Sequence, residues 1–406
     1  MKIVVLGGAA NMAQPALNYL VKLESVKEIV LTDLNEKRLI EIAERLGEKA
    51  TTKKLNVTDK DKLESIITNA NLVMNFIGPY YRFKTNAMEA AINSGVNYID
   101  LCDDYDVTIE ALKLDQLAKE KGVTAITGMG ASPGVTNIFA RLGAEALDSA
   151  DEINTYWVVG DAEPSGFGAL VHMFHIIKGK VPTFLDGELQ WIRAFQPETA
   201  KKLDFGDPVG EVTLYHVGHP EPITLPKYIP NIKKVTNQGA LLPEFQNPMF
   251  KTLVDLGMTS EETFPFKGEQ VAPLDFLLSL FEYKQEEAKK RPRRREKRRS
   301  VGATRIEVIG EKDGKKAIYT FTKSGYTTMD HGTSMPAGLV AGMILNEEIT
   351  MKGVIAPECL DPKKIIAALQ EIGHFEGEKD FIVTRTIHDK VDTGSITDDR
   401  MFPELR

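Results

Sequence analysis

Residues 1–13 read MKIVVLGGAANMA, which is an apolar run, two glycines and the beginning of a helical pattern. A strand, a glycine turn and a helix in this order can seat a dinucleotide's pyrophosphate on backbone amides, where the helix dipole favours negative charge. On the pattern G-x-G-x-x-G/A the three positions are Gly8, Ala10 and Ala13. Because Ala10 adds a methyl group near the phosphate, a plain strand–helix turn is the alternative. The residues predicted to hold the pyrophosphate are Gly8, Ala10, Asn11 and Met12.

An acidic residue supports the dinucleotide interpretation. Asp33 follows the next apolar run, 25 residues after Gly8. A carboxylate there accepts hydrogen bonds from the adenosine ribose and repels a 2′-phosphate, which favours NAD. NADP stays open, because Lys37 and Arg38 follow closely and could tolerate a phosphate. The alternative role for Asp33 is that of a helix N-cap, which Asn35 could also supply.

From this turn to residue 126 the chain alternates short apolar runs with helical periodicity. The alternation predicts a Rossmann-like, doubly wound parallel sheet, since crossovers between parallel strands are right-handed. Strands are predicted at 3–6, 28–31, 53–57, 72–77, 96–100 and 123–126, and helices at 12–23, 36–46, 59–67, 85–93 and 109–121.

The middle of the chain has more alternating runs, which predict a second α+β domain with a mixed or antiparallel sheet. The fold class is therefore α/β with two domains. Near the end, residues 334–345 predict an apolar helix with Pro336 in its first turn, and residues 362–371 predict an amphipathic helix. The predicted parts are a dinucleotide-binding domain (1–130), a substrate-binding and dimerisation domain (131–333) and a C-terminal segment packing back on the first domain (334–406).

Composition places the chain among ordinary globular proteins. It has 406 residues, a formal net charge of −8, 42% hydrophobic residues and two cysteines, which argues against a disordered or disulfide-rich protein. No apolar stretch reaches the ~20 residues of a membrane helix and no signal peptide is evident, so we expect a cytoplasmic protein without membrane contact. The basic run KKRPRRREKRR at 289–299 could bind nucleic acid. It lacks interleaved aromatic residues for base stacking, so we expect a solvated loop instead.

Further candidates follow the other predicted strands, because ligands bind beyond the carboxyl ends of the strands in open α/β sheets. Near the cofactor we expect Asn56, Val57, Ile77, Gly78, Pro79 and Asp103. Near the substrate we expect Tyr80 and Arg82, and from the glycine-rich loop at 128–137 also Ser132 and Asn137. That loop opens a helix, so its amides could hold a substrate carboxylate.

Histidines come in two close pairs, His172 with His175 and His216 with His219. No cysteine pair accompanies them, so we expect no metal site. A histidine with a pKa near 6.5 could accept the proton of a reacting amine, while a packing histidine is the alternative. The predicted catalytic residues are Asp104 and His175, and the further candidates for gripping the substrate are His172, Arg193 and His219.

Two blocks, GPYYRFKTNAMEAAINSGVNYID (78–100) and GMGASPGVTN (128–137), together with the first turn, resemble the saccharopine dehydrogenase family. That family includes saccharopine reductases, lysine 6-dehydrogenases and carboxynorspermidine dehydrogenases. The resemblance implies a Rossmann domain, a second domain with substrate and dimer contacts, and NAD(P)-linked hydride transfer at a C–N bond. It therefore implies a homodimeric enzyme that acts on a small amino-acid-type molecule.

One departure from the family bears on the substrate. Saccharopine reductases are expected to carry an arginine near the position of His219, which would grip a substrate carboxylate. Its absence favours a lysine-like amino acid or an amino-acid-derived amine over saccharopine. The alternatives are a saccharopine reductase proper, and a non-catalytic scaffold that binds NAD or nucleic acid, because a fold does not establish activity.

Overall fold

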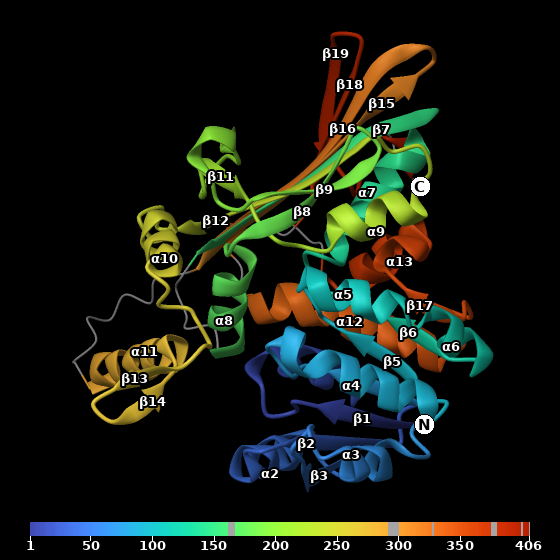
Figure 1. The fold of residues 1–406 in the computed structure, drawn as a ribbon. Helices are drawn as coiled ribbons and strands as arrows, with labels where there is room; N and C mark the ends of the chain where they lie inside the picture. The colour runs from blue at the N-terminus through green and yellow to red at the C-terminus, as the bar shows by residue number, and fades with distance from the viewer. Residues whose placement is uncertain (161–166, 291–299, 327–328, 375–379, 399–400, 406) are drawn as a thin grey trace.

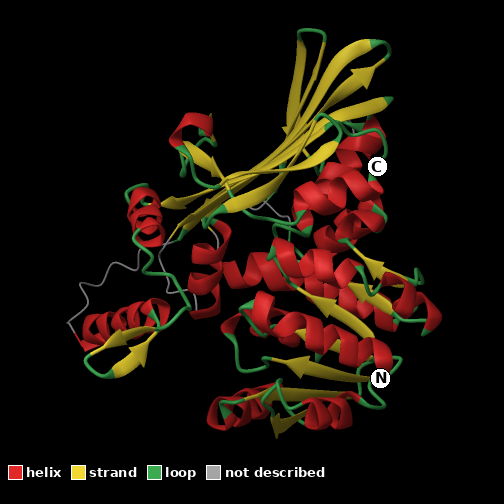
Figure 2. Cartoon of the chain, in the orientation of Figure 1, coloured by secondary structure: helices red, strands yellow, loops and turns green. Residues whose placement is uncertain are grey.

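The structure is a computed structural model that describes residues 1–160, 167–290, 300–326, 329–374, 380–398 and 401–405. Two sheets dominate it, and helices lie between and around them (Figures 1 and 2). Residues 291–299 of the basic run lie outside the described residues, so the expectation of a solvated loop stays a prediction. Among the described helices, none combines the length and apolar character that crossing a membrane requires.

The first sheet is parallel, with the strand order β17-β6-β5-β4-β1-β2-β3, which confirms the Rossmann-like prediction. Its strands are β1 (Lys2–Leu6), β2 (Glu28–Asp33), β3 (Ala50–Lys54), β4 (Leu72–Asn75), β5 (Asn97–Asp100), β6 (Thr124–Ile126) and β17 (Gly353–Ile355). Its helices are η1 (Asn11–Ala13), α1 (Gln14–Leu20), α2 (Glu36–Leu46), α3 (Lys60–Ile67), α4 (Tyr80–Asn93), α5 (Tyr105–Leu112) and α6 (Asp115–Glu120).

Several boundaries differ from the prediction. The third strand is Ala50–Lys54 instead of 53–57, because it is a polar edge strand whose register is set by pairing with β2. Helix α4 begins at Tyr80 instead of residue 85, directly after Pro79 in the N-cap position. The helix predicted at 109–121 is two helices, because the amides of Lys113 and Leu114 bond to carbonyls three residues back and tighten the chain.

The second sheet has ten strands, mixed in direction, as predicted for the second domain. They are β7 (Ser149–Gly160), β8 (Lys180–Leu185), β9 (Glu188–Arg193), β10 (Lys201–Asp204), β11 (Glu211–His216), β12 (Lys234–Leu242), β15 (Val301–Lys312), β16 (Lys315–Tyr326), β18 (Ile382–Ile387) and β19 (Lys390–Ser395). The accompanying helices are α7 (Val135–Ala146), α8 (Phe167–Ile176), α9 (Glu221–Tyr228), η2 (Pro197–Thr199), η3 (Pro357–Cys359), α13 (Pro362–Glu371) and η5 (Pro403–Leu405).

A smaller group of elements extends from one end of this sheet (Figure 1). It consists of α10 (Gln246–Asp255), a two-stranded ribbon of β13 (Phe264–Phe266) and β14 (Glu269–Val271), and α11 (Pro273–Lys290).

The C-terminal part of the chain contributes to both sheets. β17 lengthens the first sheet, whereas β18 and β19 lengthen the second. The long helix α12 (Met329–Leu345) packs on α1, and a Cβ added at Gly338 would lie 3.0 Å from the Cα of Ala16. The predicted domain boundaries at 130 and 333 stay predictions.

Helix α12 also corrects one expectation. Pro336 lies inside the helix and not in its first turn, because the helix already begins at Met329. A proline in a helix interior removes a backbone hydrogen bond. The helix continues because almost all of its residues from Ser334 to Leu345 are buried against the rest of the molecule, and this packing outweighs local preference.

Candidate active site

A glycine turn follows β1 as the sequence predicted, but the glycine that the turn requires is Gly7 and not Gly8, which the pattern had placed first. Gly7 has a positive φ of 76°, and a Cβ there would approach the carbonyl carbon of Phe76 to 2.9 Å. Only glycine fits this position without strain. The amides of Gly7 and Gly8 both donate to the carbonyl of Thr32 at 2.9 Å, which fixes the turn against β2. The following residues, Asn11 and Met12, begin η1, where a helix start leaves backbone N–H groups for a ligand.

Asp33 lies directly beside this turn. Its carboxylate accepts hydrogen bonds from the amides of Ala9 at 3.3 Å and Asn35 at 3.0 Å. Asn35, not Asp33, caps α2. Arg38 crosses the same turn, donating to the carbonyl of Ala9 at 2.8 Å and to Asn11 Oδ1 at 2.6 Å. The turn, the helix start and the carboxylate at the end of β2 together fit the pyrophosphate and ribose of a dinucleotide.

The other predicted cofactor residues follow β3, β4 and β5. Asn56 accepts hydrogen bonds from the amide and hydroxyl of Thr58, and Val57 is buried. The Ile77 amide donates to Asn75 Oδ1 at 2.9 Å, and the chain continues through Gly78 and Pro79 into α4. A Cβ on Gly78 would lie 3.6 Å from Gly168 Cα at the start of α8, so the second domain approaches the first at this loop.

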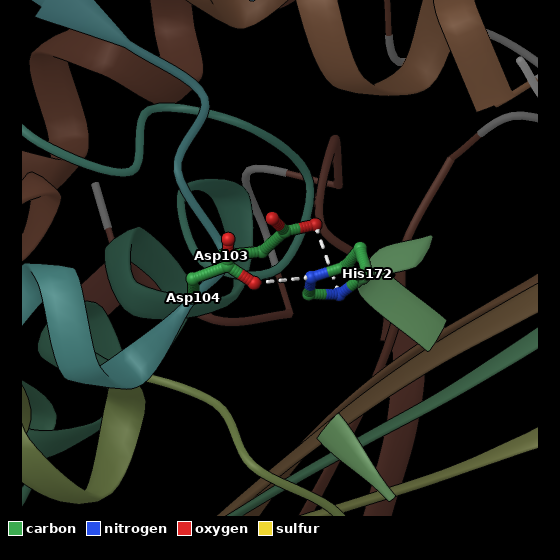
Figure 3. A group of neighbouring side chains, drawn as sticks. All are labelled: Asp103, Asp104 and His172. Atoms are coloured by element: carbon green, nitrogen blue, oxygen red, sulfur yellow. Dashed lines mark hydrogen bonds and ion pairs between the residues drawn. The ribbon is translucent and has the colours of Figure 1, made fainter. Parts of the chain in front are cut away.

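A cluster of three side chains joins the two domains, and we name it the Asp104 site: Asp103, Asp104 and His172 (Figure 3). Asp103 and Asp104 come from the loop between β5 and α5, and His172 comes from α8. The Nδ1 of His172 lies 2.7 Å from Asp104 Oδ1, and its Nε2 lies 3.2 Å from Asp103 Oδ2. Both carboxylates therefore point at one imidazole.

Asp104 is held rigidly. Its carboxyl group is fully buried, and its second oxygen accepts the amide of Tyr81 at 2.9 Å. It occupies the N-cap position of α5 but makes no side-chain cap there, so its hydrogen-bonding capacity is directed to His172 and Tyr81. Burial alone would raise the pKa of Asp104, but the hydrogen bond and charge of His172 outweigh it and lower that pKa. Asp104 is therefore an ionised partner for the imidazole.

The pKa of His172 moves in the opposite direction. Burial alone would lower it, but the charge of Asp103 and the hydrogen bond to Asp104 raise it from 6.5 to about 9. At neutral pH the site therefore holds an imidazolium between two carboxylates. These three side chains are close enough together to ligate an ion. However, each imidazole nitrogen faces its own carboxylate instead of a shared centre, and this favours proton transfer over metal binding.

The raised pKa of His172 predicts a pH dependence of stability. Because the folded-state pKa exceeds the unfolded value, the added stability is fully present below about pH 6.5 and is lost as pH rises through about 9. The shift corresponds to about 3 kcal/mol. Urea unfolding of the wild type and His172→Gln should show this difference near pH 6 and not near pH 10 (both values being about 0.5–1 unit outside the two pKa values). Equal differences at both pH values would contradict it.

His175 lies on the same helix one turn further and has different partners. Its Nε2 is 3.2 Å from Asp106 Oδ2, and its ring stacks on Tyr81 and Tyr105 with centroid distances of 4.6 and 5.5 Å. The structure thus brings His172, and not His175, to Asp104. His219 lies behind His172, with ring centroids 5.7 Å apart.

Buried and partly buried polar groups near His219 include two further predicted substrate residues, Ser132 and Asn137. His219 Nδ1 is 3.3 Å from Glu221 Oε2, and Ser132 Oγ donates to the other oxygen of Glu221 at 2.5 Å. Asn137 donates to Glu358 at 2.9 Å. Burial raises the pKa of Glu358 to about 7. Ser132 and Asn137 therefore bind protein carboxylates here.

The remaining residues predicted to lie near the substrate make contacts outside the Asp104 site. The Tyr80 hydroxyl donates to the carbonyl of Asn75 at 3.2 Å. Arg82 pairs with Glu261 at 2.8 Å, and the Tyr81 hydroxyl donates to the same carboxylate. Arg193 lies at the end of β9 and lines a cavity that contains no residue of the Asp104 site.

Lys84 was missed by the sequence analysis. It is fully buried in α4, 3.6 Å from Asp100 Oδ2, and it donates to Thr127 Oγ1 at 2.5 Å. Asp100 Oδ1 accepts the amides of Cys102 and Gly128, so the pair ties together α4 and the loops after β5 and β6. The sequence does indicate that Lys84 is buried, because it precedes the apolar residues Met88 and Ala91 at helical spacing and so lies on the buried face of α4.

The comparisons with known proteins agree with this arrangement. Residues 3–126 match the saccharopine dehydrogenase NADP binding domain, and residues 186–374 match the saccharopine dehydrogenase C-terminal domain. The chain belongs to the saccharopine dehydrogenase family, and its first domain is that family's nicotinamide cofactor-binding domain.

Individual relatives are similar over most of the chain. A carboxyaminopropylagmatine dehydrogenase of Synechocystis is 26% identical, covering 92% of this chain and 96% of the relative. A carboxynorspermidine synthase of Vibrio alginolyticus is also 26% identical, covering 83% and 86%. The solved apo saccharopine dehydrogenase (L-Glu forming) from Saccharomyces cerevisiae has the same fold, with a TM-score of 0.67 at 17% identity over 97% of this chain and 99% of that one.

Proposed function

We propose that the protein is an NAD-dependent dehydrogenase that acts on the amine-bearing carbon of an amino-acid-derived amine. The observation that carries the proposal is the His172 imidazole between Asp103 and Asp104, at the junction of the cofactor-binding domain with the second domain. A proton-exchanging group with a strongly shifted pKa at such a place is typical of an active site.

The residues at this site would manage the proton of the reaction. The bound nicotinamide would supply or accept the hydride at the carbon next to nitrogen. In the reductive direction, the imidazolium of His172 donates a proton to nitrogen, and in the oxidative direction the neutral imidazole accepts the amine proton. Asp104 orients the ring through Nδ1, and the partly exposed Asp103 faces Nε2. Oxidative turnover should therefore rise with pH towards about 9.

The charge of the site favours a cationic substrate. Two carboxyl groups, those of Asp103 and Asp104, face the single positive charge of His172, although burial raises the pKa of Asp103, and Arg82 is already paired with Glu261. A site of this charge suits a lysine-like compound, with a distal ammonium group, better than the tricarboxylate saccharopine. The relatives support the same class, because their names denote carboxylated amines related to polyamines. A cytoplasmic homodimer is part of this proposal.

We expect tighter binding of NAD than of NADP, because the Asp33 carboxylate beside the glycine turn repels a 2′-phosphate. Asp33→Ala should narrow the difference mainly by weakening NAD, since a hydrogen bond to a charged group contributes about 1.5–3 kcal/mol. Fluorescence titration of both dinucleotides with both proteins measures this. A clear NADP preference of the wild type would contradict the role of Asp33.

The test of the function is cofactor reduction, read by absorbance, across a panel of lysine-like amino acids, carboxylated polyamines and saccharopine. The proposal expects turnover with a cationic amine above that with saccharopine. Greater activity with saccharopine would identify a saccharopine reductase. Cofactor binding without turnover of any of these amines would support the alternative of a non-catalytic scaffold.

A further inference from the structure

A cavity of about 470 Å³ lies in the second domain, lined by residues of β7, β8, β9, β11 and β12 and of the segment 196–201. Four of its lining residues are polar and buried, namely Asn154, Thr183, Thr236 and Gln238. No residue of the first domain is among its lining residues in the part of the chain that the structure describes. The cavity is therefore separate from the Asp104 site.

The cavity and the Asp104 site lie on opposite sides of one sheet layer. Along β12, Thr236 and Gln238 face the cavity, so the intervening Asn237 faces the other side. There Asn237 accepts a hydrogen bond of 3.0 Å from the Trp157 indole, whose ring centroid lies 5.6 Å from that of His219. His216, the last residue of β11, thus lines the cavity. His219, three residues later, lies on the opposite side of the sheet.

Most charges and polar groups in the cavity are already paired. Lys234 binds Glu152 at 2.7 Å, and the Thr236 hydroxyl donates to Asn154 at 2.6 Å. Lys201 donates to the Tyr156 hydroxyl at 2.6 Å and lies 3.3 Å from Glu307, which engages two of its three N–H groups.

Arg193 is different, because its guanidinium has no hydrogen-bond or ion-pair partner among the described residues. It lines the cavity as a planar group with five N–H donors, a geometry that matches a carboxylate in bidentate fashion. His216, which lines the same cavity, is uncharged at neutral pH, since burial and the charge of Lys234 lower its pKa to about 4. The lining also includes the apolar side chains of Leu185 and Ile192.

We propose that this cavity binds a small monocarboxylate, whose carboxylate pairs with Arg193 and whose apolar part lies against Leu185 and Ile192. The charges of the cavity lining indicate that the ligand carries a single negative charge. Lys234 is paired with Glu152 and Lys201 with Glu307, so Arg193 is the cation of the lining whose charge no described ion pair offsets. The carboxylate of the ligand also accepts a hydrogen bond from the third N–H group of Lys201.

Calorimetric titration of the full chain with benzoate tests the proposal, with the neutral isostere benzamide as ligand control. We expect saturable benzoate binding that Arg193→Gln weakens by about tenfold or more, and much weaker binding of benzamide to the wild type. Arg193→Lys should bind with intermediate affinity, because it keeps the charge and loses the bidentate geometry. Circular dichroism of each variant checks that this exposed position tolerates the change.

A matched control distinguishes this cavity from the junction between the domains. Arg82→Gln removes an arginine near the Asp104 site and should leave benzoate binding unchanged. The proposal is overturned if benzoate does not bind, if Arg193→Gln binds it like the wild type, or if Arg82→Gln abolishes binding. Inorganic phosphate that binds as well as benzoate, with the same dependence on Arg193, would identify a general anion site and overturn the carboxylate assignment.

Discussion

Replacing Asp104 by asparagine should lower turnover by ~10²-fold or more while leaving the affinity for NAD unchanged. Asparagine keeps the size of the side chain and can still accept the Tyr81 amide, but it removes the negative charge that lies 2.7 Å from His172 Nδ1. The imidazole then loses its orienting partner and one of the two carboxylates that raise its pKa, while the charge of Asp103 remains. Steady-state kinetics with the best amine of the panel, together with a separate titration of NAD, measure the two effects.

Asp106→Asn is the matched control, because Asp106 lies two residues away and its carboxylate is 3.2 Å from His175 without a hydrogen bond to that ring. Its carboxylate is 44% exposed, so the pair is solvated and the substitution should change turnover little. Loss of turnover in Asp106→Asn with normal turnover in Asp104→Asn would assign the acid–base role to His175 instead of His172.

Replacing Lys84 by methionine should destabilise the protein by about 3–5 kcal/mol, because breaking a buried ion pair leaves an uncompensated charge. The carboxylate left behind is that of Asp100, which holds the amides of Cys102 and Gly128. Burial alone would lower the pKa of Lys84, but the charge of Asp100 outweighs it and raises that pKa, so the lysine is charged. Urea unfolding followed by circular dichroism measures the change.

Two further variants make this measurement decisive. Lys113→Met removes a lysine that pairs with Glu110 at 2.6 Å on the surface, and it should change stability by less than about 1 kcal/mol. The double variant Lys84→Met/Asp100→Asn removes both charges and should recover part of the loss. If Lys84→Met is as stable as Lys113→Met, the buried pair does not hold these loops together.

The first sheet could be predicted in detail because its strands are buried and apolar and alternate with periodic helices. The polar edge strand β3 was placed wrongly, since neither of its faces carries an apolar pattern. The mixed sheet of the second domain was predicted only as a class, because its order depends on pairs between strands far apart in sequence, such as β7 with β15.

The site was partly accessible from sequence. Asp103 and Asp104 followed a predicted strand, and the carboxyl ends of parallel strands gather at one edge. The choice between His172 and His175 was not accessible, because the two lie one turn apart on α8 and only the docking of that helix determines which one meets Asp104. Glu221 and Glu358 could not be predicted either, because each contacts the site only through residues that are distant in sequence.

Deuterium transfer from reduced nicotinamide deuterated at C4 tests directly whether the hydride goes to a carbon bonded to nitrogen. The protein is incubated with this cofactor, a lysine-like amine and a carboxylated aldehyde, which condense to an imine with loss of water, and the product is analysed by mass spectrometry and NMR. We expect a new secondary amine that carries one deuterium on the carbon bonded to nitrogen, and loss of this product in Asp104→Asn. Deuterium on a carbon bonded to oxygen, or transfer to a C=C bond with no C–N product, would contradict it.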